Sequence, residues 1–268
     1  MLISPPNKYR IKRVISALGI RVRPGAKPRA DLRGFLVHVR SLGFSPATVI
    51  DVGVADGTIE LYSTFPGAFH LLVEPAREFE GALQFICRHY NAAYVIAAAT
   101  DEDGEATLRC TSDLHGASTI EDTGASAQPR FSRVVPAFTL DTLAEEHSTR
   151  GPYLIKADTQ GTELTVLDGA KRLLAETEIV VLEVSLFRFG ASAPVLDEVI
   201  SYMKTRGFVV YDVFGGHGRP LDGALAQLDI AFVKEAGQFR ASHLYYSEEQ
   251  ARAYNNSLVC RIRKRLNV

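Results

Sequence analysis

The sequence contains few cysteines and no long apolar run. Its 268 residues include only Cys87, Cys110 and Cys260, which are far apart and form no C-x-x-C pair. An odd number of distant cysteines argues against a disulfide framework and against a zinc site, so we expect free thiols in a reducing compartment. No stretch approaches the roughly 18 apolar residues of a membrane span, and no secretory signal pattern follows the basic N-terminus. The expected location is therefore the cytoplasm.

Several catalytic motifs are also missing. The sequence has no H-E-x-x-H, no P-loop and no G-x-S-x-G with suitable partners. It therefore offers no motif for a zinc metalloprotease, a P-loop nucleotidase or a serine hydrolase. The composition, 46% hydrophobic and 23% charged, is ordinary for a globular protein. The length allows one large α/β domain or two small ones.

The net charge of −1 conceals two basic ends. Residues 1–40 carry +9 and residues 252–268 carry +5, whereas residues 41–251 carry −15. Basic ends of this kind can bind an anionic surface or a phosphorylated substrate. They can also dock on the acidic body of the same chain or on a second subunit of a homodimer. The sequence does not decide between these alternatives. The ends lack the repeated aromatic residues on which single strands stack, so we expect no nucleic-acid partner.

Short apolar runs alternate with helical patterns after residue 48. This alternation predicts an α/β fold with a mostly parallel sheet that helices cover on both faces. The expected strands are 48–52, 68–73, 93–98, 153–155, 179–182, 208–213 and 228–233, and the expected helices between them include 76–90 and 163–175.

The two ends and one internal stretch differ from this pattern. Apolar stripes predict helices over 7–19 and 30–43, and 104–136 has the pattern of short strands around a polar loop near the sheet edge. The expected organisation is a basic helical segment over 1–43, an α/β body over 44–240 and a basic helical tail over 241–268.

The first expected strand ends in "DVGVADG" (51–57), a D-x-G-x-x-x-G pattern. Glycine allows a tight turn and close approach of a ligand, and the following helix offers free N–H groups. The G-x-G-x-x-G spacing of dinucleotide-binding loops is absent. Asp51 and Asp56 would repel a pyrophosphate and suit a cationic ligand, which favours S-adenosylmethionine over a nicotinamide cofactor. The loop residues expected at the cofactor are Asp51, Gly53, Val54, Ala55 and Gly57.

The next two strand ends extend this prediction. Glu74 ends the second strand 21 residues after Gly53 and is followed by Pro75. An acid at this spacing is the expected partner of the ribose hydroxyls. The third run ends in small residues that leave room for an adenine ring. There we expect Ala99 beside the ring and Asp101 at its amino group, although an Asp-Gly turn explains most of that pattern.

The fourth and fifth strands end in ionisable residues. "IKADTQGTE" (155–163) places Lys156 and Asp158 at one strand end, and "VVLEVS" places Glu183 at the next. Neighbouring parallel strands lie about 4.8 Å apart, so Asp158 and Glu183 should face one crevice near the methyl group. One carboxylate could act as general base toward a substrate hydroxyl, or the two together could bind a hard divalent cation. In a purely structural alternative, Lys156 forms an ion pair with one of them. We predict Asp158, Glu183 and Lys156 as catalytic residues, with Asp158 also near the cofactor, and we assign no metal ligands.

These residues resemble those of the FkbM-type S-adenosylmethionine-dependent methyltransferases. The resemblance covers about residues 48–235 and includes "DVGVADG", "VEP", "TLDTL", "IKADTQGTELTVLDGA" and "VLEVS". Many members have Ala-Asn after the first glycine, where this chain has Val54 and Ala55. The resemblance implies a class I methyltransferase fold, with a seven-stranded sheet whose last strand, here 228–233, is antiparallel. It also implies O-methylation of sugar or polyketide hydroxyls.

The expected function is O-methylation of a small-molecule or glycan hydroxyl. The acceptor pocket is expected in the loops at 104–136, 185–194 and 214–222, which include His115 and His217. An alternative is a non-catalytic scaffold of the same fold that docks to a membrane or to glycan-assembly enzymes. A nicotinamide-dependent oxidoreductase fits the acidic first loop poorly.

Overall fold

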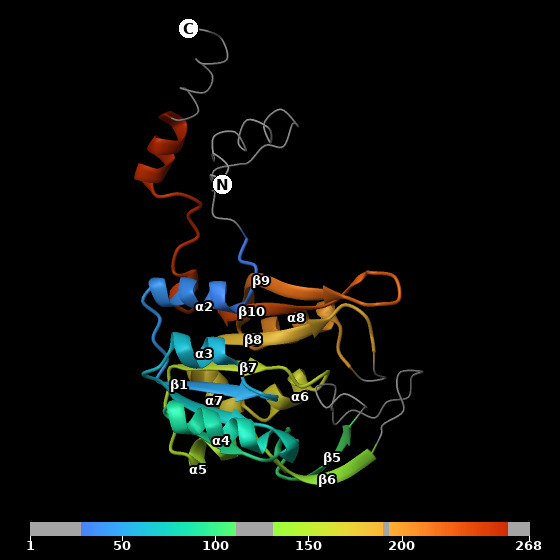
Figure 1. Cartoon of the computed structure of the whole chain (residues 1–268). Coiled ribbons are helices and arrows are strands. Elements are labelled where there is room, and N and C mark those ends of the chain that lie inside the picture. Colours follow the sequence, from blue (N-terminus) through green and yellow to red (C-terminus); the bar gives the residue numbers. More distant parts are fainter. Residues whose placement is uncertain (1–27, 111–130, 190–192, 257–268) are drawn as a thin grey trace, which may run out of the picture.

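A seven-stranded sheet forms the centre of the molecule (Figure 1). This computed structural model describes residues 28–110, 131–189 and 193–256, and the helix expected over 7–19 lies outside them. The strand order is β3-β2-β1-β7-β8-β10-β9, and β10 runs antiparallel to both of its neighbours. The expected α/β sheet with an antiparallel last strand is therefore confirmed. The strands are β1 (Thr48–Val52), β2 (Phe69–Val73), β3 (Ala92–Val95), β7 (Tyr153–Ala157), β8 (Thr177–Ser185), β9 (Phe208–Gly218) and β10 (Leu225–Lys234).

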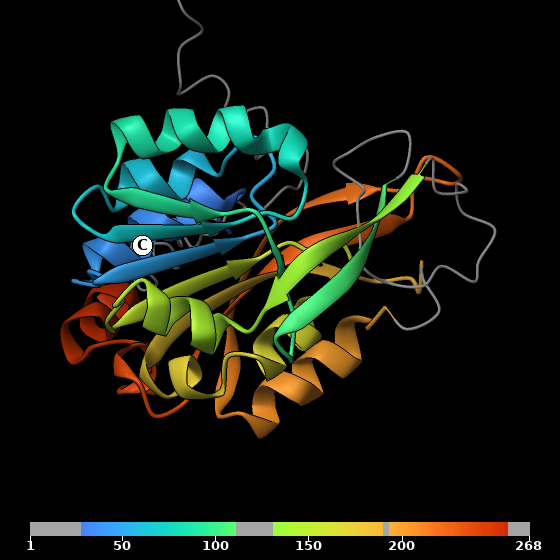
Figure 2. The ribbon, with the colours of Figure 1, turned by 90° about the horizontal axis from the view of Figure 1, so that it is seen from below.

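Helices cover both faces of this sheet (Figure 2). Successive strand side chains point to opposite faces, and β1 is buried at all five positions, as expected for a central parallel strand. Val49 packs with α2 (Leu32–Ser41), α3 (Ile59–Thr64) and α4 (Glu80–His89). Ile50 belongs to the opposite cluster, whose helices are α5 (Leu140–Glu146), α6 (Glu163–Asp168), α7 (Lys171–Glu176) and α8 (Leu196–Thr205).

The single helix expected over 163–175 is wrong, because the chain forms α6 and α7 with a break at Gly169 and Ala170. A Cβ atom on Gly169 would lie 2.0 Å from the carbonyl oxygen of Thr100. The Gly169 carbonyl also accepts a 3.0 Å hydrogen bond from the Asp141 amide. This close approach of two backbone segments interrupts the helix, and the apolar periodicity continues across the break.

The third expected strand, 93–98, is also divided. It leaves the main sheet after β3, and β4 (Ala98–Ala99) joins a second sheet of order β4-β6-β5. This smaller sheet contains β5 (Gly104–Cys110) and β6 (Phe131–Phe138), which are the two short strands expected within 104–136. Arg133 of β6 donates two hydrogen bonds, of 2.8 and 2.6 Å, to Glu78 in the short helix η1 (Arg77–Phe79). These bonds connect the smaller sheet to the rest of the protein.

The two ends of the described chain lie outside the sheet. The expected helix over 30–43 is α2, and the Asp31 side chain caps it by accepting a 2.8 Å hydrogen bond from the Gly34 amide. Residues 248–256 form a helix that stands apart from the body (Figure 1). Of the rest of the expected tail, residues 241–247 contain no helix, and residues 257–268 lie outside the described ranges. Within those ranges, no helix has the length and apolar character needed to cross a membrane.

Candidate active site

The loop after β1 is built around a fully buried carboxylate. Asp51 is 0% exposed, and its Oδ2 accepts a 2.6 Å hydrogen bond from the Tyr62 hydroxyl. The Thr58 amide in turn donates to that hydroxyl over 3.1 Å. Asp51 Oδ1 has no hydrogen-bond partner among the described residues. Burial raises the pKa of Asp51, and the nearby Lys156 partly opposes this.

Two glycines of this loop lie too close to other parts of the chain to be replaced by a larger residue. Gly53 has φ +74°, and a Cβ atom there would lie 1.9 Å from the carbonyl oxygen of Asp158. Gly57 has φ +115°, and its Cβ would lie 2.7 Å from Ile86 Cδ1. The sequence prediction assigned the glycines to a tight turn and to close approach of a ligand. In the structure they allow the loop to pack against α4 and against Asp158, which directly follows β7. Val54 is buried, and Ala55 also has a positive φ of 47°.

Glu74 ties the end of β2 to the same loop. It is 5% exposed, its Oε2 accepts a 2.9 Å hydrogen bond from the Ala55 amide, and its Oε1 accepts one of 2.8 Å from the Ala76 amide. Burial raises the pKa of Glu74, although both amides favour its charged form. Gly53 N also donates to the Val73 carbonyl over 2.9 Å. The first two strand ends therefore form one rigid unit.

The loop after β7 is held by its own side chains. Lys156 Nζ donates to Asp158 Oδ2 over 3.2 Å, and Gln160 Nε2 donates to Asp158 Oδ1 over 3.0 Å. Glu163 Oε1 accepts from the amides of Thr159 (2.9 Å) and Gly161 (3.0 Å). Glu163 is 4% exposed. Its buried carboxylate therefore stabilises the loop through these two amides, in addition to lying in the first turn of α6.

The predicted meeting of Asp158 and Glu183 is present. Gln160 Nε2 lies 3.0 Å from Asp158 Oδ1 and 3.0 Å from Glu183 Oε2, so one amide bridges the two carboxylates. Lys156 is buried beside them. Burial alone would lower its pKa, yet the carboxylates of Asp158 and Asp51 hold the pKa above its ordinary value, so the ammonium stays charged.

Sequence reasoning missed two residues of this site, Asp229 and Gln227 of β10. Asp229 lies directly opposite Glu183 in the β8–β10 register, and Gln227 Nε2 donates to Glu183 Oε2 over 2.7 Å. The prediction examined only the C-terminal ends of strands. Because β10 is antiparallel, its beginning lies at this edge of the sheet. The sequence feature that could have revealed this residue is an aspartate within the otherwise apolar run "LDIAFV".

The remaining predicted residues lie at the periphery. Ala99 is 7% exposed and belongs to the second sheet, whereas Asp101 is exposed and Pro75 is half-buried. His217 is exposed on β9, and His115 lies outside the described ranges. Within those ranges no group of three or more His, Cys, Asp or Glu side chains is placed to hold a metal ion.

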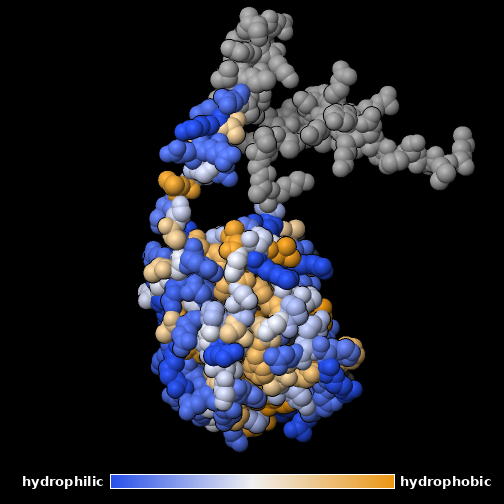
Figure 3. Space-filling view, turned by 90° about the vertical axis from the view of Figure 1, so that its left-hand side faces the viewer, coloured by the Kyte–Doolittle hydropathy of each residue, from blue (hydrophilic) through white to orange (hydrophobic). Residues whose placement is uncertain are grey.

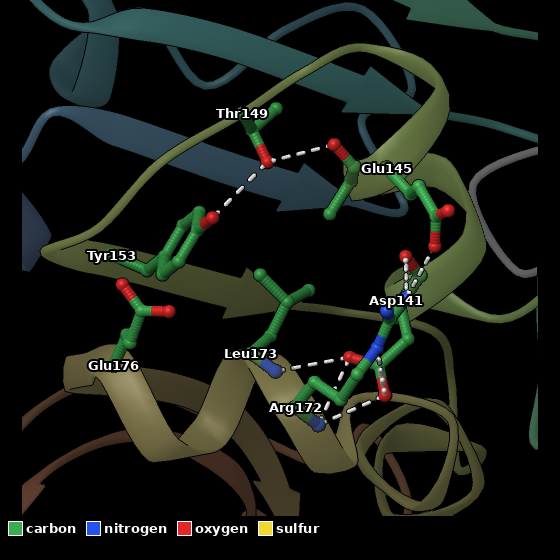
Figure 4. Close-up of a pocket in the computed structure, with 8 residues that line it drawn as sticks. Asp141, Glu145, Thr149, Tyr153, Arg172, Leu173 and Glu176 are labelled. Carbon is green, nitrogen blue, oxygen red and sulfur yellow. Dashed lines mark hydrogen bonds and ion pairs between the residues drawn. The ribbon is translucent and has the colours of Figure 1, made fainter.

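The molecule also has a hollow at the opposite edge of the sheet (Figure 4). It measures about 270 Å³ and lies beside Tyr153, the first residue of β7. The amino ends of the strands lie on the side that Figure 3 shows, where apolar side chains gather in the middle of the face. Ion pairs from Arg172 to Asp141 and Glu145 line the hollow. The charged residues described above therefore lie at the far ends of the strands from this hollow.

The sheet order, the antiparallel β10 and the glycine loop facing Glu74 define the fold of the class I methyltransferases. The sequence model of the methyltransferase FkbM domain matches residues 51–210. The chain belongs to the FkbM methyltransferase family and is an S-adenosylmethionine-dependent methyltransferase.

The chain is also similar to several solved methyltransferase structures. One is a precorrin-6y C5,15-methyltransferase from Geobacter metallireducens, at 12% identity and a TM-score of 0.42, covering 79% of this chain and 93% of that one. Another is the N-methyltransferase NodS from Bradyrhizobium japonicum, at 13% identity and a TM-score of 0.42, covering 75% and 93%. A third is fibrillarin from Aeropyrum pernix with bound S-adenosyl-L-methionine, at 14% identity and a TM-score of 0.38, covering 69% and 66%. No curated protein matches the chain.

Proposed function

We propose that this methyltransferase acts on a hydroxyl of a sugar, glycan or natural-product acceptor and forms a methyl ether. The observation that carries the proposal is the Gln160 bridge, which holds Asp158 and Glu183 together beside the first loop. Carboxylates at this place suit the orientation and deprotonation of a neutral hydroxyl. Cys87 and Cys110 are free thiols, and the cytoplasm remains the proposed location.

The residues at the first two strand ends fit S-adenosylmethionine. Asp51 Oδ1 is a buried oxygen without a partner, and neither Asp51 nor Glu74 has an ion-pair partner within 4.0 Å in the described ranges. Buried carboxyl groups without an ion-pair partner in contact favour a positively charged ligand, and the nearby Lys156 only partly opposes the effect of burial on Asp51. We propose that Asp51 stabilises the ammonium end from beneath the loop. Glu74 would accept the ribose hydroxyls with its remaining lone pairs.

The site residues around β7 would position the acceptor. S-adenosylmethionine supplies an electrophilic methyl group on a positively charged sulfur. Asp158 is already anchored by Lys156 and Gln160, so its carboxylate is held in one orientation toward an incoming hydroxyl. Such positioning supplies much of the rate in a transfer between two bound molecules.

The direct test is transfer of a tritiated methyl group from S-adenosylmethionine to defined acceptors. The panel contains nucleotide sugars, methyl glycosides and a hydroxylated polyketide, with transfer RNA and a protein mixture for comparison. Base-stable label on a hydroxyl supports the proposal, whereas label on nitrogen, carbon or nucleic acid contradicts it. Asp158→Asn should bind the donor normally and lose about 10²–10⁴-fold in turnover, whereas Glu146→Gln, an exposed change at the end of α5, should lose nothing.

A further inference from the structure

Asp229 and Glu183 are two carboxylates on one face of the sheet. They are directly opposed in the antiparallel register of β10 and β8. The Cβ atoms of such partners lie about 4.5–5.5 Å apart, so the two side chains are neighbours. Both residues are half-buried, and neither makes an ion pair within 4.0 Å in the described chain. Two like charges in this position cannot both ionise without cost.

The hydrogen bonds to Glu183 add no charge. The amides of Gln160 and Gln227 both donate to its Oε2, over 3.0 and 2.7 Å. An amide orients a carboxyl group but does not neutralise it. Burial and the nearby Asp158 and Asp229 raise the pKa of Glu183 to about 8.

Asp229 keeps an open side. Gly215 of β9 has φ +62°, and a Cβ atom there would lie 2.9 Å from Asp229 Oδ2. The missing side chain leaves the carboxylate room at the edge of the site. Burial raises the pKa of Asp229 to about 6, and Lys156 opposes this rise. The charged groups that influence the pair are Lys156 of β7, Asp158 and Glu163 of the following loop and helix, and His217 of β9.

We propose that Glu183 and Asp229 hold one proton between them in the free protein, release it when the positively charged methyl donor binds, and then take the proton of the acceptor hydroxyl. The inference rests on the proposed function. It adds Asp229 as a catalytic residue, and it means that the carboxylate pair can accept a proton only after donor binding has deprotonated it.

The proton balance of this cycle closes. Donor binding sends one proton from the pair to solvent. In the transfer, the hydroxyl O–H bond breaks and its oxygen bonds to the methyl carbon, while the electrons of the C–S bond stay on sulfur. The hydroxyl proton goes to the carboxylate pair, which is again singly protonated when the neutral sulfide product leaves.

The test compares proton release by S-adenosylmethionine and by S-adenosylhomocysteine, which lacks the methyl group and the charge on sulfur. Calorimetry at pH 7 in buffers of different ionisation enthalpy counts the protons released and needs no acceptor. A group with a pKa of about 8 is roughly 90% protonated at pH 7. At an effective dielectric constant of about 20, any positive charge between about 6 and 12 Å from a carboxyl group lowers its pKa by about one to two units. We therefore expect S-adenosylmethionine to release about 0.4–0.8 of a proton more than S-adenosylhomocysteine.

Two variants locate the proton. In Glu183→Gln the excess release should disappear, and in Asp229→Asn it should fall by at least half, whereas Glu146→Gln should match the wild type. If both ligands release equal numbers of protons from the wild type, the inference is overturned. It is also overturned if Asp229→Asn shows the same excess release as the wild type. Neither result contradicts the proposed function. If neither ligand binds, the proposed function fails as well.

Discussion

Replacing Glu183 with glutamine should change how stability depends on pH. Burial and the neighbouring Asp158 and Asp229 raise the pKa of Glu183 from its ordinary 4.5 to about 8. Because the folded state binds this proton more tightly than the unfolded state, the wild type is stabilised below about pH 4.5. It loses that stabilisation as the pH rises toward 8.

The size of the effect follows from the shift. A change of 3.5 pKa units corresponds to at most about 5 kcal/mol, and coupling to Asp158 and Asp229 reduces the expected value to about 2–3 kcal/mol. Glutamine keeps the shape of the side chain and offers a carbonyl oxygen to the amides of Gln160 and Gln227. The variant should therefore gain free energy of unfolding relative to the wild type between pH 5 and pH 9.

Urea unfolding followed by circular dichroism measures this difference, since the chain has no tryptophan for fluorescence. The wild type, Glu183→Gln and the exposed control Glu146→Gln are compared at pH 5, 7 and 9 and at one ionic strength. A constant difference between Glu183→Gln and the wild type across this range would refute the reasoning.

Other substitutions test the packing around the site. Gly53→Ala should lower the free energy of unfolding by about 3 kcal/mol or more, because the new Cβ meets a backbone oxygen at 1.9 Å, whereas Gly67→Ala, with nothing within 4 Å, should change it by less than about 1 kcal/mol. Tyr62→Phe removes the hydroxyl that donates to Asp51 and should cost about 1–3 kcal/mol in the same measurement. Gly81→Ala, in the open space of α4, should stabilise the protein by about 0.5–1 kcal/mol, and a loss of stability there would contradict the helix assignment.

The parts of the fold that local patterns control were predicted from the sequence. The strands at 48–52 and 153–155 are short, mostly apolar runs, and both occupy the expected central positions in the sheet. The meeting of Asp158 and Glu183 followed because adjacent parallel strands end at one edge. Here the sequence pattern and the sheet geometry required the same arrangement.

The features that depend on distant contacts were not predicted. Gly169 breaks a helix because it passes the Thr100 carbonyl, 69 residues earlier in the chain. Glu163 is a buried clamp because the loop folds back over it, and the sequence showed only an acid at a helix start. Asp229 was missed because an antiparallel strand brings its beginning, not its end, to the active edge. Each of these errors concerns tertiary structure and not local propensity.

The central claim is that the ends of β1 and β2 bind S-adenosylmethionine. Titration calorimetry of the wild type and of Glu74→Gln with this ligand tests it most directly. We predict binding of one ligand per chain, and an affinity about 10–100-fold lower in Glu74→Gln, because a charge-assisted hydrogen bond is worth about 1.5–3 kcal/mol. Glu146→Gln should bind as the wild type does. The absence of binding by the wild type, or equal affinity in Glu74→Gln, would contradict the claim.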